Sequence, residues 1–152
     1  MERERYTVRT NEDHTLFEFI SQGPVGDITK IVLYQHWGGE VYNLAFGDYE
    51  ETTGWFNDTS RSNNGDMKKV LATVAHTLLT FLQHYPNAEI KIQGSSQART
   101  RLYQMQLVLN IRDISSQFSI KGYFEGNWET FKKGKNYESF SISNKKRSKF
   151  GY

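Results

Sequence analysis

One long helical stretch between residues 66 and 85 constrains the fold of this sequence more than any other feature. At about 100° per residue its apolar side chains fall in one broad sector, and polar ones lie opposite. The helix is expected to end before Pro86. The apolar sector contains Val70, Leu71, Val74, Leu78, Phe81, Leu82 and Tyr85, and the opposite side Lys69, Thr73, His76, Thr77 and Thr80.

Strand-like segments precede this helix. Residues 16–20 form an apolar run that Gly23 and Pro24 end, and residues 27–37 are rich in β-branched and aromatic side chains. Residues 41–49 follow directly after Gly38 and Gly39, so these two segments are predicted to form a hairpin. A further short strand is expected through residues 55–56.

A strand, a second helix and more strands follow. The strand is predicted at residues 88–93 and the helix at 96–110, and strands at 118–124, 128–131 and 137–142 close the chain. The predicted fold class is α+β, with a mixed, mainly antiparallel sheet and two main helices in the order β-β-β-α-β-α-β-β. Ala98, Leu102, Met105 and Leu109 are predicted to form the apolar stripe of the second helix.

Domain organisation follows from length and composition. The chain has 152 residues, only two prolines and no linker-like segment, so one domain is predicted at residues 1–144. Residues 145–152 form a basic tail, interpreted as a solvated terminus or as a contact for nucleic acid or a protein partner.

The absence of cysteine excludes disulfides and thiol chemistry. The first residues lack the apolar core of a signal peptide, and no segment approaches the length of a membrane span. These features predict a cytoplasmic protein without membrane contact. A net charge of +2 makes nucleic acid the weaker choice of partner.

Two strand-to-helix turns are candidate anion sites, because a helix N-terminus presents unpaired N–H groups. In the first turn, residues 62–66, Asn64 is the expected N-cap and Gly65 allows a tight turn. Asp66 is expected in the first turn of the helix, where its carboxylate satisfies the dipole. Asn64 and Gly65 are nevertheless candidate ligand-binding residues.

The second turn, residues 94–101, carries two arginines where cations oppose the helix dipole. Ser95 or Ser96 is the expected N-cap. Arg99 and Arg101 require a negative partner, which is either a bound anion or a carboxylate of the chain; the candidate carboxylates are Asp48, Glu50, Asp58 and Asp66. Ser95, Ser96, Arg99 and Arg101 are therefore candidate ligand-binding residues.

The helical wheel separates the two arginines. Arg99 and Tyr103, at i and i+4, can converge on one object, whereas Arg101 lies on the other side of the stripe. Asp48 belongs to an acidic cluster with Glu50, Glu51 and Asp58. It is interpreted as a partner for the arginines or, alternatively, as a general base.

The order of elements resembles the core of the GCN5-related N-acetyltransferase fold. The resemblance places 62–67 at that family's pyrophosphate loop, Ala98 with Leu102-Tyr103 at its second helix motif, and 134–140 at its last strand. It implies acetyl-coenzyme A as cofactor and Tyr103 as general acid. In this chain Ser62 replaces the Gln or Arg of the family loop, and Asp66 puts negative charge where phosphate would lie.

The phrases VYNLAFGDY, SNNGD and RTRLYQM also resemble a family of small uncharacterised bacterial proteins. No pair of histidines has the spacing of a metal-binding helix, and His76 and His84 are expected to be solvated. Trp37, Trp55 and Trp128 are interpreted as core or hairpin residues, with stacking on a ligand as the alternative.

Two functions remain open from the sequence. The first is a ligand-binding domain, related to acyltransferases, for a phosphate-bearing small molecule, with Tyr103 and Asp48 as candidate catalytic residues. The second is a protein-interaction module, such as a regulator or an antitoxin-like partner. The sequence does not decide whether the chain is an enzyme.

Overall fold

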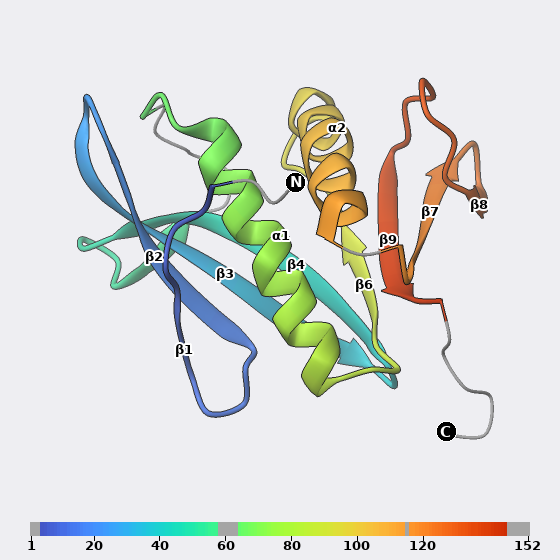
Figure 1. Cartoon of the computed structure of the whole chain (residues 1–152), viewed down its shortest axis with the longest axis horizontal. Helices are drawn as coiled ribbons and strands as arrows, with labels where there is room; N and C mark the ends of the chain where they lie inside the picture. The colour runs from blue at the N-terminus through green and yellow to red at the C-terminus, as the bar shows by residue number, and fades with distance from the viewer. Residues whose placement is uncertain (1–3, 58–63, 115, 146–152) are drawn as a thin grey trace.

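A computed structural model describes residues 4–57, 64–114 and 116–145, and both of its helices pack on one face of a single sheet (Figure 1). The sheet has nine strands in the order β1-β2-β3-β4-β6-β9-β7-β8, and β5 pairs with β4. The strands are β1 Arg9–Thr10, β2 Leu16–Gly23, β3 Gly26–Gly38, β4 Val41–Glu50, β5 Trp55–Asn57, β6 Glu89–Ile92, β7 Phe118–Phe124, β8 Asn127–Thr130 and β9 Ser139–Asn144. The helices are α1 Met67–His84 and α2 Gln97–Ile114.

The predicted α+β class and the mainly antiparallel sheet are confirmed. Every strand pair is antiparallel except β4 with β6, which run side by side in the same direction. The first helix and the strands occur close to their predicted positions, and the two-residue strand β1 was not predicted. The predicted hairpin across Gly38 and Gly39 is also present. Both glycines have positive φ, which glycine adopts without steric cost.

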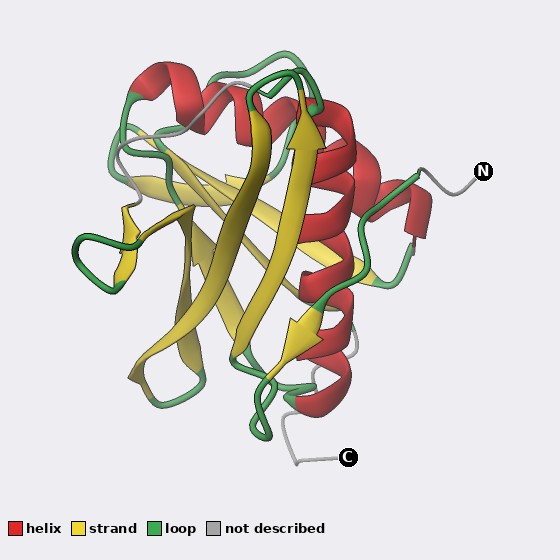
Figure 2. Ribbon diagram, turned by 90° about the vertical axis from the view of Figure 1, so that its left-hand side faces the viewer, coloured by secondary structure: helices red, strands yellow, loops and turns green. Residues whose placement is uncertain are grey.

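The hydrophobic core lies between the helices and the sheet face that they cover. Strand side chains alternate, so every second residue of each strand points towards the helices. Figure 2 shows long strands of the sheet lying along one side of the upright helix α1. The inward residues include Phe17, Phe19, Val32, Tyr34, Leu44, Phe46, Ile90, Ile92, Phe140 and Ile142.

Helix α1 is buried on more sides than the sequence pattern predicts. Thr73 and Thr77 were expected on its polar side, but both are fully buried. The backbone N–H of Tyr6 donates to Thr73 Oγ1 at 2.9 Å, because the N-terminal segment covers this side of the helix. Thr77 Oγ1 lies 2.7 Å from the hydroxyl of Tyr34 on the sheet. Both threonine hydroxyls therefore have hydrogen-bond partners in positions that polarity alone assigns to solvent.

The predicted apolar stripe of α2 is wrong. Met105 and Leu109 are 60% and 46% exposed, and Ala98 is also exposed. The buried side instead includes polar residues with hydrogen-bond partners, and for this reason a search for apolar periodicity alone selects the wrong face. The buried residues of α2 are Thr100, Tyr103, Gln104, Leu107, Val108, Asn110 and Ile111.

Some sequence-based predictions fall outside the described residues. These are Asp58, residues 62–63 of the first turn and residues 146–152 of the basic tail. Within the described ranges, neither helix has the length and apolar character needed to cross a membrane.

Candidate ligand-binding site

A cavity lies where the two parallel strands of the sheet separate. β4 and β6 are paired from Val41 and Glu89 to Leu44 and Ile92, and beyond this point β6 turns away into α2. β5 joins β4 only from Asp48 onward. A cavity of about 250 Å³ borders the intervening part of β4 and the turn after β6. It therefore lies at the carboxyl ends of a parallel strand pair, where open α/β sheets place their ligands.

The cavity is bordered by β4 residues that face both sides of the sheet. Leu44 and Phe46 contribute side chains that point towards the helices, whereas Asn43 and Ala45 alternate with them and face the opposite side. Tyr103 reaches the cavity from α2 and is only 4% exposed.

The remaining wall of the cavity is formed by Trp37 and by residues 93–95. Trp37 is 62% exposed, so the alternative of core packing is wrong for this residue, which lies in β3 at the end of the β3–β4 hairpin. No carboxylate is present among the described residues that line the cavity.

The turn into α2 is tightly fixed against the end of β6. Ser96 Oγ accepts from the backbone N–H of Arg99 at 3.2 Å, which confirms a serine as N-cap. The Thr100 hydroxyl accepts from Gly94 N at 3.0 Å and donates to Ser96 O at 3.0 Å. A Cβ atom on Gly94 would lie 2.5 Å from the backbone nitrogen of Thr100. Only glycine permits this approach of strand and helix.

The two arginines of this turn lie in different places. Arg99 Nη1 donates to Ser95 Oγ at 2.6 Å, and Ser95 lines the cavity, so Arg99 is placed at its rim. Arg101 is exposed and does not line the cavity. Among the predicted residues, the structure therefore brings Ser95 and Tyr103 to the cavity, with Arg99 next to them.

The first turn has a different role in the structure. The expected N-cap, Asn64, is wrong: Asp66 is the N-cap of α1. Asn64 is 3% exposed and is held by the β2–β3 turn, where its Oδ1 accepts from Val25 N at 2.8 Å and its Nδ2 donates to Gly26 O at 2.8 Å. Gly65 has positive φ and lies beside the same turn. Neither residue lines the cavity.

Asp66 is held by hydroxyl groups. Its Oδ2 accepts from Tyr6 at 2.5 Å and from Ser21 at 2.6 Å. Burial raises the pKa of Tyr6, and the hydrogen bond to Asp66 raises it further. The N-terminal segment, β2 and the start of α1 are joined by these contacts, which gives the SNNGD turn a structural explanation.

Asp48 forms a buried ion pair with Lys30, its direct cross-strand neighbour on β3. The side chains are 12% and 4% exposed. Both project to the helix side of the sheet, in the same alternation as Val32 and Phe46. Asp48 does not line the cavity, although it lies two residues beyond Phe46. The sequence feature that could have indicated this pair is Lys30, a lysine at an inward position of β3.

Other side chains offer less for a bound ion. No group of three or more His, Asp or Glu residues within the described ranges could hold a metal. His84 is exposed, as expected, and stacks on His14 with ring centroids 3.6 Å apart. Sequence reasoning missed Asn43 and Gln93 as cavity residues, because neither belongs to a motif.

Comparison with known proteins gives a family but no characterised relative. No curated protein and no solved structure shows significant similarity to the chain. The profile of one family, described as a family of unknown function (DUF6934), matches residues 2–145. Because this match covers nearly the whole sequence, the chain belongs to the DUF6934 family.

Proposed function

We propose that this chain is a ligand-binding domain that holds a small anionic molecule in the cavity between β4 and β6, as a divergent relative of acyltransferases. The observation that carries the proposal is the cavity itself. It lies at the carboxyl end of β6, where its parallel pairing with β4 ends, beside the N-terminus of α2, and its described lining includes hydroxyl and amide groups without a carboxylate. Partial positive charge at a helix N-terminus favours an anion here.

The surrounding side chains support a particular orientation of the ligand. Ser95, Ser96 and Arg99 would contact the anionic group at the start of α2, since Arg99 and Ser95 already lie side by side. Trp37, which is largely exposed and also lines the cavity, offers an aromatic ring for stacking. A volume of about 250 Å³ suits a small metabolite or one part of a larger cofactor.

The acyltransferase relationship gives Tyr103 the role of proton donor, since it is the ionisable residue that lines the cavity from α2. Asp48 is better explained as a support for β4, because Lys30 holds it. Asp66 and the buried Asn64 disfavour phosphate at the start of α1. Coenzyme A is therefore one ligand to test, and its phosphates would need contacts at α2 instead.

A thermal-shift panel tests this function. Acetyl-coenzyme A, ATP, AMP and inorganic phosphate are each added to the full chain. A ligand present at about one hundred times its Kd stabilises the fold by about 2.7 kcal/mol. This corresponds to a rise in Tm of roughly 5–10 °C for a chain of this size. At least one anion should produce such a rise.

Variants locate the binding site. Ser95→Trp should abolish the shift by blocking the cavity, and Ser95 is exposed, so the fold tolerates the larger side chain. Arg99→Ala should weaken the shift, whereas Arg101→Ala, an exposed arginine away from the cavity, is the matched control. The proposal is wrong if no anion raises the Tm, or if Ser95→Trp responds like the wild type.

A further inference from the structure

The outer side of α2 exposes apolar and basic side chains together. Arg101, Met105, Leu109 and Arg112 are spaced four, four and three residues apart, so they follow one line along the helix. All four are exposed, and Met105 and Leu109 have 60% and 46% of their surface in solvent. Two apolar residues therefore lie between two arginines on a surface that the core does not use.

This stripe borders a groove. Met105, Val108 and Leu109 form one wall, and Phe131 with residues 133–134 forms the other, around a volume of about 290 Å³. Arg112 and Phe131 also line an adjoining hollow of about 400 Å³ that extends to β7. The Arg112 guanidinium lies 5.5 Å from the centre of the Phe131 ring. Both hollows are lined by this pair, and together they are called the α2 groove.

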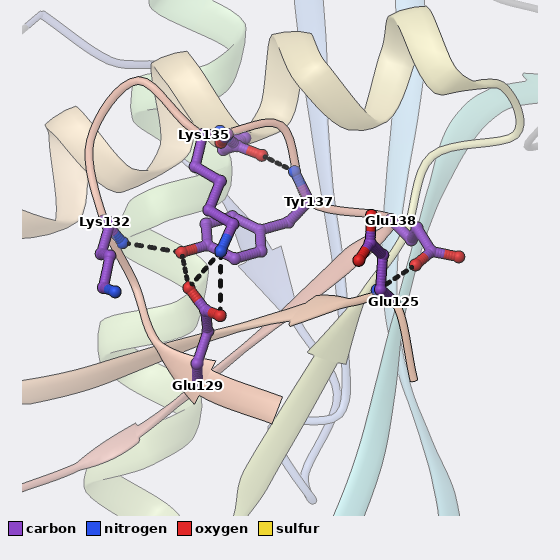
Figure 3. Close-up of polar contacts among 7 residues, drawn as sticks. Glu125, Glu129, Lys132, Lys135, Tyr137 and Glu138 are labelled. Carbon is purple, nitrogen blue, oxygen red and sulfur yellow. Dashed lines mark hydrogen bonds and ion pairs between the residues drawn. The ribbon is translucent and has the colours of Figure 1, made fainter. Parts of the chain in front are cut away.

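The wall opposite α2 is held in place by its own polar network (Figure 3). Lys135 Nζ lies 2.9 and 3.0 Å from the two carboxylate oxygens of Glu129, and the Tyr137 hydroxyl donates to Glu129 at 2.8 Å. The backbone N–H of Lys132 donates to the same hydroxyl at 3.0 Å.

Gln104 of α2 completes the attachment. Its Oε1 accepts from Tyr137 N at 3.0 Å, and its Nε2 donates to the carbonyl of Lys135. The loop is therefore fixed to the helix, and the groove exists before any partner arrives. Preorganisation of this kind lowers the entropic cost of binding.

The positive charge of the α2 groove indicates the chemistry of its partner. The described lining of the α2 groove contains Arg112, Lys133 and Lys145 but no carboxylate. Arg101 is exposed on α2 one turn before Met105. A second copy docked through the same surface would place these cations against each other, which is unfavourable in a symmetric interface. An acidic partner would be attracted instead.

We propose that the α2 groove binds an acidic segment of a partner protein, which inserts apolar side chains between Met105, Leu109 and Phe131. The carboxylates of that segment would contact Arg101, Arg112 and Lys133. This inference is independent of the cavity between β4 and β6, which lies on another part of the molecule and shares none of these residues.

Selection from a random peptide library displayed on phage tests this surface. The immobilised full chain serves as bait, and the double variant Leu109→Glu/Arg112→Glu is used for counter-selection. Both substituted residues are exposed, so the fold should be retained. The enriched peptides should combine acidic with apolar residues. Their affinity, measured by fluorescence anisotropy, should fall about tenfold or more in the single variant Leu109→Glu.

The matched controls are Val25→Glu, at an exposed apolar residue elsewhere, and Arg9→Glu, at an exposed cation elsewhere. Both should leave peptide affinity unchanged. The inference is overturned by enrichment of basic peptides, by no enrichment over the double variant, or by peptides that bind all variants equally. Sedimentation that finds a dimer dissociated by Leu109→Glu would also overturn it, since a second copy would then occupy the groove.

Discussion

The buried pair of Lys30 and Asp48 is an unusual feature of this molecule at the scale of single residues. A buried charge loses its hydration, and its ion-pair partner compensates much of the loss. Lys30 and Asp48 face each other across β3 and β4 beneath the helices. Each side chain therefore depends on the other, and the sheet depends on both at this point.

Removal of one partner should be costly. Asp48→Asn leaves the ammonium of Lys30 buried without its counterion, and we expect a loss of about 3 kcal/mol in the free energy of unfolding. The double variant Lys30→Met/Asp48→Leu should recover most of this loss, because no charge remains buried. Urea unfolding followed by circular dichroism measures both.

The exposed pair of Arg9 and Glu18 is the control for this comparison. Their side chains are 82% and 36% exposed. Arg9→Ala should change stability by less than about 1 kcal/mol. An equally small effect of Asp48→Asn would contradict a structural role for the buried pair.

Gly94 gives a second prediction at this scale. In Gly94→Ala the added methyl would overlap the backbone at residues 99–100, which cannot rotate away. We expect the variant to lose about 2 kcal/mol or more of stability and to distort the cavity. Thermal unfolding measures the loss, and Gln93→Ala, at an exposed neighbour, should leave the Tm nearly unchanged.

At the scale of elements, the connection between β8 and β9 is held mainly by charge-assisted contacts. Hydrogen bonds from Lys135 and then from Tyr137 lower the pKa of Glu129 below its ordinary value of 4.5. Burial, followed by the hydrogen bond to Glu129, raises the pKa of Tyr137. This connection forms one wall of the α2 groove, so the protonation state of Glu129 affects that surface.

Acid should therefore loosen this loop. A carboxylate with a lowered folded-state pKa stabilises the fold above its unfolded pKa, near pH 4.5, and this contribution disappears as the pH falls through the lower folded value. Glu129→Gln should lower stability at pH 7 and reduce the loss of stability between about pH 5 and pH 3. Urea midpoints at both pH values, compared with those of the exposed-site variant Glu12→Gln, provide the measurement.

Elements with a simple pattern could be predicted from the sequence, and those with buried polar contacts could not. The hairpin at Gly38 and the helix α1 carry local signals in turn residues and apolar period. The inward face of α2 includes Gln104, whose partners Lys135 and Tyr137 lie in a distant segment. No local pattern encodes such partners, and the apolar residues Met105 and Leu109 indicated the opposite side.

The candidate site could be predicted only in part from the sequence, for the same reason. Ser95 and Tyr103 could be identified because they lie on the turn and helix that follow β6. Trp37 and Asn43 come from β3 and β4, and only the parallel pairing of β4 with β6 brings them to the cavity. The sequence could not predict this pairing, since it joins segments separated by the whole of α1.

At the scale of the whole molecule, β6 joins two groups of antiparallel strands. β4 lies on one side of it and β9 on the other. One continuous hydrophobic cluster contains residues from both groups and from both helices. We therefore expect the described chain to unfold as one cooperative unit.

Ile90 tests this expectation because it is fully buried in the middle of the joining strand. Ile90→Ala should cost about 2–5 kcal/mol through lost burial and a residual cavity. The unfolding curves from tryptophan fluorescence and far-UV circular dichroism should still coincide. Two separated transitions would show instead that the strand groups unfold independently.

The parallel contact of β4 with β6 also has a consequence for the order in which the chain folds. The hairpins of β2, β3 and β4 close over short turns, whereas the pairing of Val41 with Glu89 closes a loop that contains α1. Long-range closures of this kind carry a larger entropic cost and slow folding. We expect the cavity to form late, after the hairpins. A molecule bound there would recognise only the completed fold, and it would slow unfolding without accelerating the early steps of folding.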